Sequence, residues 1–194
     1  MAKLSRDPRF VANKRRREQE ELRLSNALKA EEGPLLSDLK SVGVSVETVW
    51  DLVNTREPYP SAVPVLMQHL SEPYSIRIKE GIARALTVPY GGRDALAAVM
   101  EEFERQNATS ENSLKWVLGN AIAVLAGPAD AEVLIQLATD TSNGKSREMI
   151  VLALPRLVKD KTRLHRILRD LQKDEDVGAF AKRAKNAART RHLD

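Results

Sequence analysis

Cysteine is absent from the 194-residue sequence, and aromatic residues make up only 4% of it. Without cysteine the chain forms no disulfide, holds no cysteine-ligated zinc and has no thiol nucleophile, which fits a reducing compartment. Because aromatic residues are scarce, most of the apolar side chains are leucine, alanine, valine and isoleucine. This composition suits closely packed helices.

Long apolar runs are also lacking. No stretch approaches the roughly 20 apolar residues that a membrane-spanning helix needs. The first ten residues, MAKLSRDPRF, contain no apolar core of the kind found in a signal peptide. We therefore expect a cytoplasmic protein with no membrane partner, and a chain of this length is large enough to bury a core as one continuous body.

Catalytic and metal-binding motifs are missing from the sequence. The three histidines, His69, His165 and His192, show no metal-ligand spacing among themselves. No glycine-rich loop follows a strand pattern, and no serine stands in a nucleophile elbow. We expect no enzymatic activity, no cofactor, no metal and no small-molecule substrate.

The charge that is present is unevenly distributed. The net charge of +4 combines a balance of +6 in residues 1–17, −8 in residues 18–155 and +7 in residues 156–191, with Asp194 adding the last negative charge. The basic character therefore belongs to the two ends of the chain and not to its middle.

Apolar residues recur at helical spacing in paired segments. Between residues 128 and 158, one apolar helix, a polar turn and a second apolar helix follow one another, with apolar positions at Val133, Leu134, Leu137, Ala138, Ile150, Ala153, Leu154 and Leu157. Two helices joined in this way cannot cover their own apolar faces, so the unit needs similar units stacked on it. Aligning the second helices on Leu86, Ile122 and Leu154 indicates repeat lengths of 36 and 32 residues. The pattern predicts an all-α, right-handed α-solenoid of about four to five helix pairs.

The N-terminal region differs from these units. Residues 8 to about 32 are expected to form an exposed, charged helix that Gly33-Pro34 ends, so residues 1–33 form an arm and residues 34–191 the solenoid. A further helix is expected to start after Ser45, with Trp50 in the core. In the next unit Ser61 is the expected N-cap and Pro64 lies in the first turn.

The chain resembles the HEAT-repeat family, clearly over residues 61–158 and more loosely over 34–190. That family's repeat has a leucine and an acid before its turn, and a basic residue early in its second helix. Leu137-Ala138-Thr139-Asp140 with Arg147 matches this pattern, as does Leu70-Ser71-Glu72 with Ile78-Lys79. Leu114-Lys115 matches only its second half. The resemblance implies a solenoid, a fold that serves scaffolds, transport factors and nucleic-acid enzymes.

Equivalent positions on the second helices form rows that would line the concave face of a solenoid. Lys79, Lys115 and Arg147 either bond the acids and carbonyls of their own or the adjoining turn, or form a positive stripe. Trp116 either anchors a partner or wedges between repeats. The predicted partner-binding residues are Lys79, Glu80, Arg84, Lys115, Trp116, Asn120, Arg147 and Glu148.

Two functions remain open on these grounds. The first is an adaptor that binds a protein partner through the concave face. The alternative is a nucleic-acid binder that grips phosphates through its basic ends, by Lys14, Arg15, Arg16, Arg17, Lys182, Arg183, Lys185 and Arg189. No aromatic residues are interleaved with the C-terminal cations for base stacking, which favours the adaptor.

Overall fold

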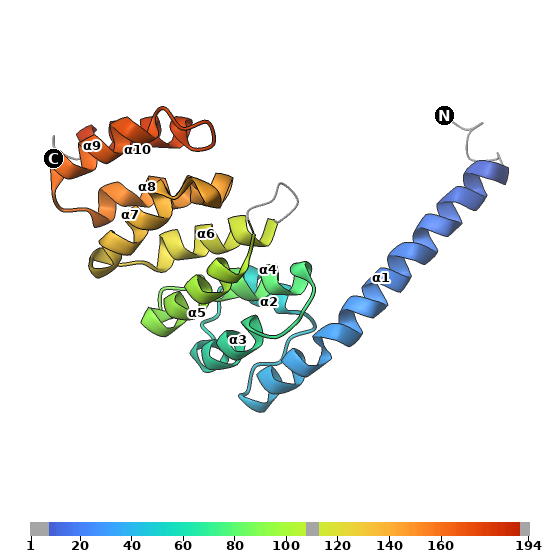
Figure 1. The fold of residues 1–194 in the computed structure, drawn as a ribbon. Coiled ribbons are helices and arrows are strands. Elements are labelled where there is room, and N and C mark those ends of the chain that lie inside the picture. The colour runs from blue at the N-terminus through green and yellow to red at the C-terminus, as the bar shows by residue number, and fades with distance from the viewer. Residues whose placement is uncertain (1–7, 108–112, 191–194) are drawn as a thin grey trace.

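The computed structural model describes residues 8–107 and 113–190, and within these ranges it contains ten α-helices and no strand (Figure 1). The all-α prediction is confirmed. The helices are α1 (Pro8–Ser41), α2 (Val49–Asn54), α3 (Val63–Leu70), α4 (Ile76–Ala85), α5 (Gly92–Arg105), α6 (Ser113–Leu125), α7 (Ala131–Thr139), α8 (Glu148–Leu157), α9 (Lys161–Leu171) and α10 (Gly178–Thr190). Short 3₁₀ turns, η2 (Pro60–Ala62), η3 (Pro128–Asp130) and η4 (Thr141–Arg147), precede α3, α7 and α8.

From α3 onward the helices are arranged in sequential pairs. Helix α3 contacts α4, α5 contacts α6, α7 contacts α8, and α9 contacts α10. The even-numbered helices also contact one another in a single row that runs from α2 to α10, as Figure 1 shows. Leu86, Ile122 and Leu154, the residues that set the predicted repeat register, are all fully buried. The apolar core therefore runs continuously along the stack of pairs.

Helix α1 continues through Gly33 and Pro34, so the predicted break at this point is wrong. A proline inside a helix removes one backbone hydrogen bond and costs about 3 kcal/mol. Burial of Leu35 and Leu39, both fully covered by the body, offsets this cost. The predicted division between the arm and the body at residues 33 and 34 thus falls inside one helix.

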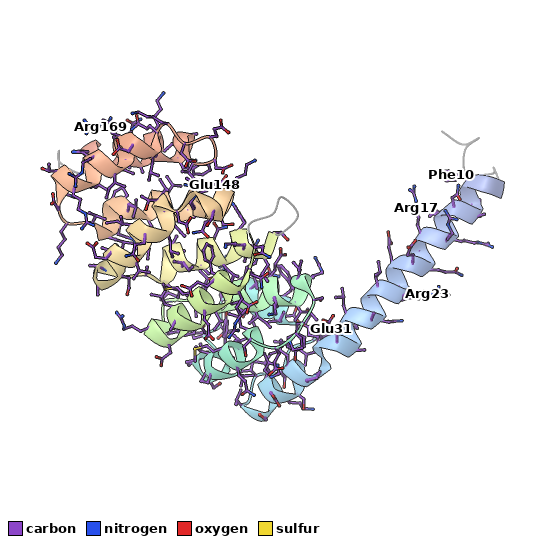
Figure 2. All side chains as sticks on the ribbon, in the orientation of Figure 1. Phe10, Arg17, Arg23, Glu31, Glu148 and Arg169 are labelled. Carbon is purple, nitrogen blue, oxygen red and sulfur yellow. The ribbon has the colours of Figure 1, made fainter. Side chains whose placement is uncertain are left out.

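Polar contacts fasten the C-terminal part of α1 to its neighbours. The buried carboxylate of Glu32 accepts hydrogen bonds from the Thr48 hydroxyl at 3.1 Å and from the Val49 amide at 2.6 Å. The carboxylate of Asp38 lies 2.9 Å from Nε2 of the buried His69. The N-terminal part of α1 projects away from the stack, and Phe10, Arg17 and Arg23 lie along this projecting part in Figure 2.

Two predicted helix starts also need correction. The helix expected directly after Ser45 begins only at Val49, and its N-cap is Thr48. Helix α3 begins after the turn η2, and the hydroxyl of Ser61 donates to the Val42 carbonyl at 3.1 Å instead of capping the helix. Pro64 does lie in the first turn of α3, as predicted. Trp50 is partly buried against the core.

Candidate partner-binding surface

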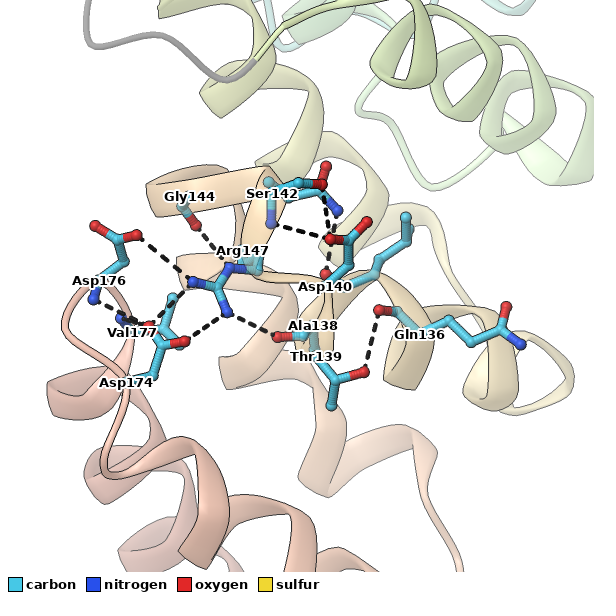
Figure 3. Close-up of polar contacts among 12 residues, drawn as sticks. Gln136, Ala138, Thr139, Asp140, Ser142, Gly144, Arg147, Asp174, Asp176 and Val177 are labelled. Carbon is cyan, nitrogen blue, oxygen red and sulfur yellow. Dashed lines mark hydrogen bonds and ion pairs between the residues drawn. The ribbon is translucent and has the colours of Figure 1, made fainter.

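Arg147 is the most completely buried of the predicted site residues, with 1% of its surface exposed. Its guanidinium donates to the carbonyls of Gly144 at 2.8 Å and Ala138 at 3.3 Å, which belong to the preceding turn and helix (Figure 3). It also donates to both oxygens of Asp174, at 2.9 and 3.0 Å, and pairs with Asp176 at 3.6 Å. The side chain therefore links the turn before α8 to the turn between α9 and α10.

This cross-link changes the titration of one partner. The hydrogen bonds from Arg147 hold the pKa of the Asp174 carboxyl below its usual value, because they stabilise the ionised form. Asp140, the acid that the repeat pattern pairs with Arg147, instead accepts hydrogen bonds from the amide and hydroxyl of Ser142. Arg147 thus bonds an acid of the adjoining turn.

The other two bases of this row are also bonded within the protein. The ammonium of Lys79 donates to the buried carboxylate of Glu102 at 2.7 Å. The ammonium of Lys115 donates to the Gln106 carbonyl at 2.7 Å and lies 4.6 Å from the centre of the Phe103 ring. Burial lowers the pKa of the Lys115 amine.

These contacts fit the structural interpretation of the row better than the positive stripe, because each base bonds an acid or a carbonyl within the protein. Lys115 is only 6% exposed. A partner cannot reach side chains buried as deeply as Lys115 and Arg147, so these two predicted partner-facing residues are structural residues instead. The reason is their length: long basic side chains reach from a helix surface back to buried carbonyls and carboxylates.

The neighbouring row is more exposed. Trp116 on α6 is 38% exposed, and its indole nitrogen donates to the Glu148 carboxylate on α8 at 2.9 Å. The ring therefore bridges two helix pairs and also reaches the surface. On α4, Glu80 is half-buried and Arg84 is exposed. Asn120 is half-buried, and its side-chain oxygen is a buried acceptor without a hydrogen-bond partner.

An exposed apolar residue that the sequence analysis missed extends this surface. Val124 on α6 is 57% exposed and follows Trp116 and Asn120 at a spacing of four, which places all three on one side of the helix. We call Trp116, Asn120 and Val124 the α6 strip. It is flanked by Glu80 and Arg84 on α4 and by Glu148 and Leu152 on α8, at equivalent positions in the two neighbouring helices. The sequence did contain a signal for Val124, because it is an apolar residue on the side of the helix that carries Asn120.

The predicted phosphate-binding residues form two separate groups. Lys14, Arg15, Arg16 and Arg17 are exposed on the projecting part of α1, where Lys14 pairs with Glu18 at 3.7 Å. On α10, Lys182 is exposed, Lys185 is half-buried, and the Arg183 guanidinium lies 5.6 Å from the Phe180 ring centre. Arg189 belongs to α10, but its side chain lies outside the described part of the structure, as does His192. Arg17 and α10 lie on opposite sides of the molecule, so the structure does not bring the two groups together (Figures 1 and 2).

Comparison of the chain with protein-family models, curated proteins and solved structures finds no match. Within residues 8–107 and 113–190, no cluster of three or more histidine, aspartate or glutamate side chains has the geometry to hold a metal ion. The same residues include no helix that is both long and apolar enough to span a membrane.

Proposed function

We propose that the stack is a HEAT-type α-solenoid that acts as a non-catalytic adaptor and binds a protein partner on the face formed by its even-numbered helices. The unbroken row from α2 to α10 supports the solenoid, because stacked second helices line one face of such folds. The cross-link from Arg147 to Asp174 supports it too, since the motif base joins one helix pair to the next.

The exposed but fixed indole of Trp116 is the observation that carries the adaptor proposal. Its hydrogen bond to Glu148 holds the ring in one orientation before any partner arrives, so binding loses little side-chain entropy. Tryptophan is enriched among the residues that dominate binding energies at interfaces. Val124, two turns along α6, extends the apolar contact.

Charge on either side of the α6 strip defines the partner's chemistry. Glu80 and Glu148 flank the Trp116 end, and Arg84 lies one turn further along α4. The matching ligand is a peptide segment with a basic residue, an apolar residue and an acidic residue in succession. Opposite charges placed in this way fix the direction in which the segment binds.

Selection from a displayed library of random 12-residue peptides against the full chain tests this proposal. The selected peptides should be enriched in an apolar residue next to Lys or Arg. Trp116→Ala and Val124→Asp should each weaken their binding at least about tenfold, as expected for central interface residues. Val133→Asp is the matched control, because Val133 is also an exposed valine, at 38%, but lies on α7.

Trp116 also provides a direct readout. The chain has two tryptophans, so a Trp50→Phe background leaves Trp116 as the only indole. A selected peptide that covers the α6 strip should shift the emission of Trp116 to shorter wavelength. Peptides that bind Val124→Asp and the unsubstituted chain equally, with no change in Trp116 emission, would place the binding surface elsewhere and refute the proposal.

A further inference from the structure

A basic groove lies between α9 and α10. Its volume is about 440 Å³, and it is lined by Thr162, His165, Arg166 and Arg169 of α9 and by Lys185 of α10. The four α9 residues follow one another at helical spacing, so they share one side of that helix. The opposite side of α9 carries the buried Leu164, Leu168 and Leu171. The groove therefore faces outward at the last pair of the stack, where Arg169 is seen in Figure 2.

The cations of this groove have no anionic partner inside the protein. Among the described residues, Arg166, Arg169 and Lys185 form no ion pair and no side-chain hydrogen bond. Arg163 on the same helix behaves differently, because it points toward the body and pairs with Glu132 of α7. Asp170 is the one acid in the α9 sequence, it does not line the groove, and the α10 sequence contains none.

A polar outer face would be enough to keep the last pair of a stack soluble. A mixture of acidic and basic side chains would keep this face soluble without repulsion between like charges. The concentration of positive charge in a single groove is therefore better explained by a negatively charged ligand. Arg166 and Arg169 lie three residues apart, about 4.5 Å along α9, and cations repeated in this way suit a ligand with repeated negative charges more than a single small anion.

We propose that this groove binds the phosphate backbone of double-stranded nucleic acid without recognising its sequence. Proteins that hold single strands use aromatic side chains as stacking platforms, and no phenylalanine, tyrosine or tryptophan is among the described residues that line this groove. A duplex presents its phosphates on the outside, where arginine and lysine neutralise them irrespective of base sequence. This site is independent of the proposed peptide surface and does not require the basic residues of α1.

Fluorescence anisotropy of a labelled 20-base-pair duplex of mixed sequence, as DNA and as RNA, titrated with the full chain tests the proposal. Three phosphate contacts predict a slope of about −2.7 for log affinity against log salt, which is a loss of roughly 40-fold between 50 and 200 mM salt. The double variant Arg166→Ala/Arg169→Ala should reduce the magnitude of that slope by about 2 and weaken binding at least about tenfold at 50 mM salt. The residues are exposed, so circular dichroism melting should confirm that the variant remains folded.

Arg23→Ala/Arg56→Ala is the matched control, because it removes the same charge from exposed arginines that do not line the groove. It should leave the affinity within about twofold, since those side chains lie away from the groove. Absence of duplex binding at 50 mM salt, or an equal loss in both double variants, would overturn the proposal. So would strong displacement by inorganic phosphate compared with chloride at equal ionic strength, because the groove would then select a single phosphate group.

Discussion

The side chains of Arg147 and Asp174, 27 residues apart in the sequence, meet through two nearly equal hydrogen bonds of 2.9 and 3.0 Å. A planar guanidinium and a carboxylate fit each other in this two-point arrangement, which is stronger than a single neutral hydrogen bond. Because Arg147 also bonds two carbonyls of its own unit, it joins three backbone segments. The contact is thus a structural joint between the last two helix pairs.

Removal of this joint should strongly destabilise the fold. Arg147→Met keeps an apolar stem but removes the guanidinium donors of Asp174 and of the Ala138 and Gly144 carbonyls, which predicts a loss of about 3–5 kcal/mol in the free energy of unfolding. Urea denaturation measures the loss. Arg166→Met serves as the control, because Arg166 is exposed and its replacement should stay within about 0.5 kcal/mol. Equal effects of the two substitutions would contradict a structural role for Arg147.

The same contact predicts a defined pH dependence. The folded-state pKa of Asp174 is lowered, so its contribution to stability is present above its unfolded pKa of about 3.9 and is lost as the pH falls through the folded value. Wild type should therefore be more stable than Asp174→Asn at pH 7. The difference should shrink as the pH falls through the lowered folded-state pKa, because the protonated carboxyl resembles the amide. Urea denaturation of both proteins from pH 7 to 2.5 measures this, and a difference that does not change with pH would exclude it.

Two glycines predict opposite effects of the same substitution. A Cβ at Gly119 on α6 would lie 2.1 Å from the Ser146 carbonyl oxygen, so Gly119→Ala should cost about 1–3 kcal/mol or more by forcing α6 and η4 apart. A Cβ at Gly33 in α1 would meet no atom within 4 Å. Gly33→Ala should therefore stabilise the protein by about 0.5–1 kcal/mol, because alanine is the better helix former. Thermal melting of both variants distinguishes them, and a stabilising Gly119→Ala would refute the close approach.

Glu32 should contribute to stability far more than other acids of α1. Its buried carboxylate is the acceptor for Thr48 and Val49, so Glu32→Ala should cost about 1–3 kcal/mol by leaving those donors unpaired. Glu20→Ala, an exposed residue in the projecting part, should change the free energy of unfolding by less than about 0.5 kcal/mol. Guanidinium denaturation compares them. Similar values for both would show that α1 is not fastened through Glu32.

The predictable part of the fold was the part governed by apolar spacing. Leu86, Ile122 and Leu154 are buried as the repeat register required, since helical periodicity follows directly from the order of the residues. The break predicted at Gly33-Pro34 was wrong because Leu35 and Leu39 are buried, and a local motif does not show burial against other parts of the chain. These tertiary contacts outweigh the local preference of proline.

The candidate sites were harder to predict, because the direction of a long side chain depends on what lies beside it. The positions of Lys115 and Arg147 on their helices are compatible with an exposed face. Their side chains nevertheless point into the stack and bond a carbonyl and a carboxylate there. The exposure of Trp116 could be expected because its apolar neighbours already supply the core side of α6. The α9 cations were missed because the sequence does not show which of them find an acid: Arg163 meets Glu132, whereas Arg166 meets none among the described residues.

Helix α10 makes its main contacts with α8 and α9, whereas α6, in the middle of the row, is contacted by α4 on one side and α8 on the other. Separating the last pair from the stack therefore breaks one interface, while opening the middle breaks two. Amide hydrogens of α9 and α10 should consequently exchange with solvent through partial opening at a lower free energy than those of α6. The basic groove thus lies on a layer that opens more easily than the middle of the stack, and a ligand that spans both helices of this layer would slow its opening without altering the rest of the molecule.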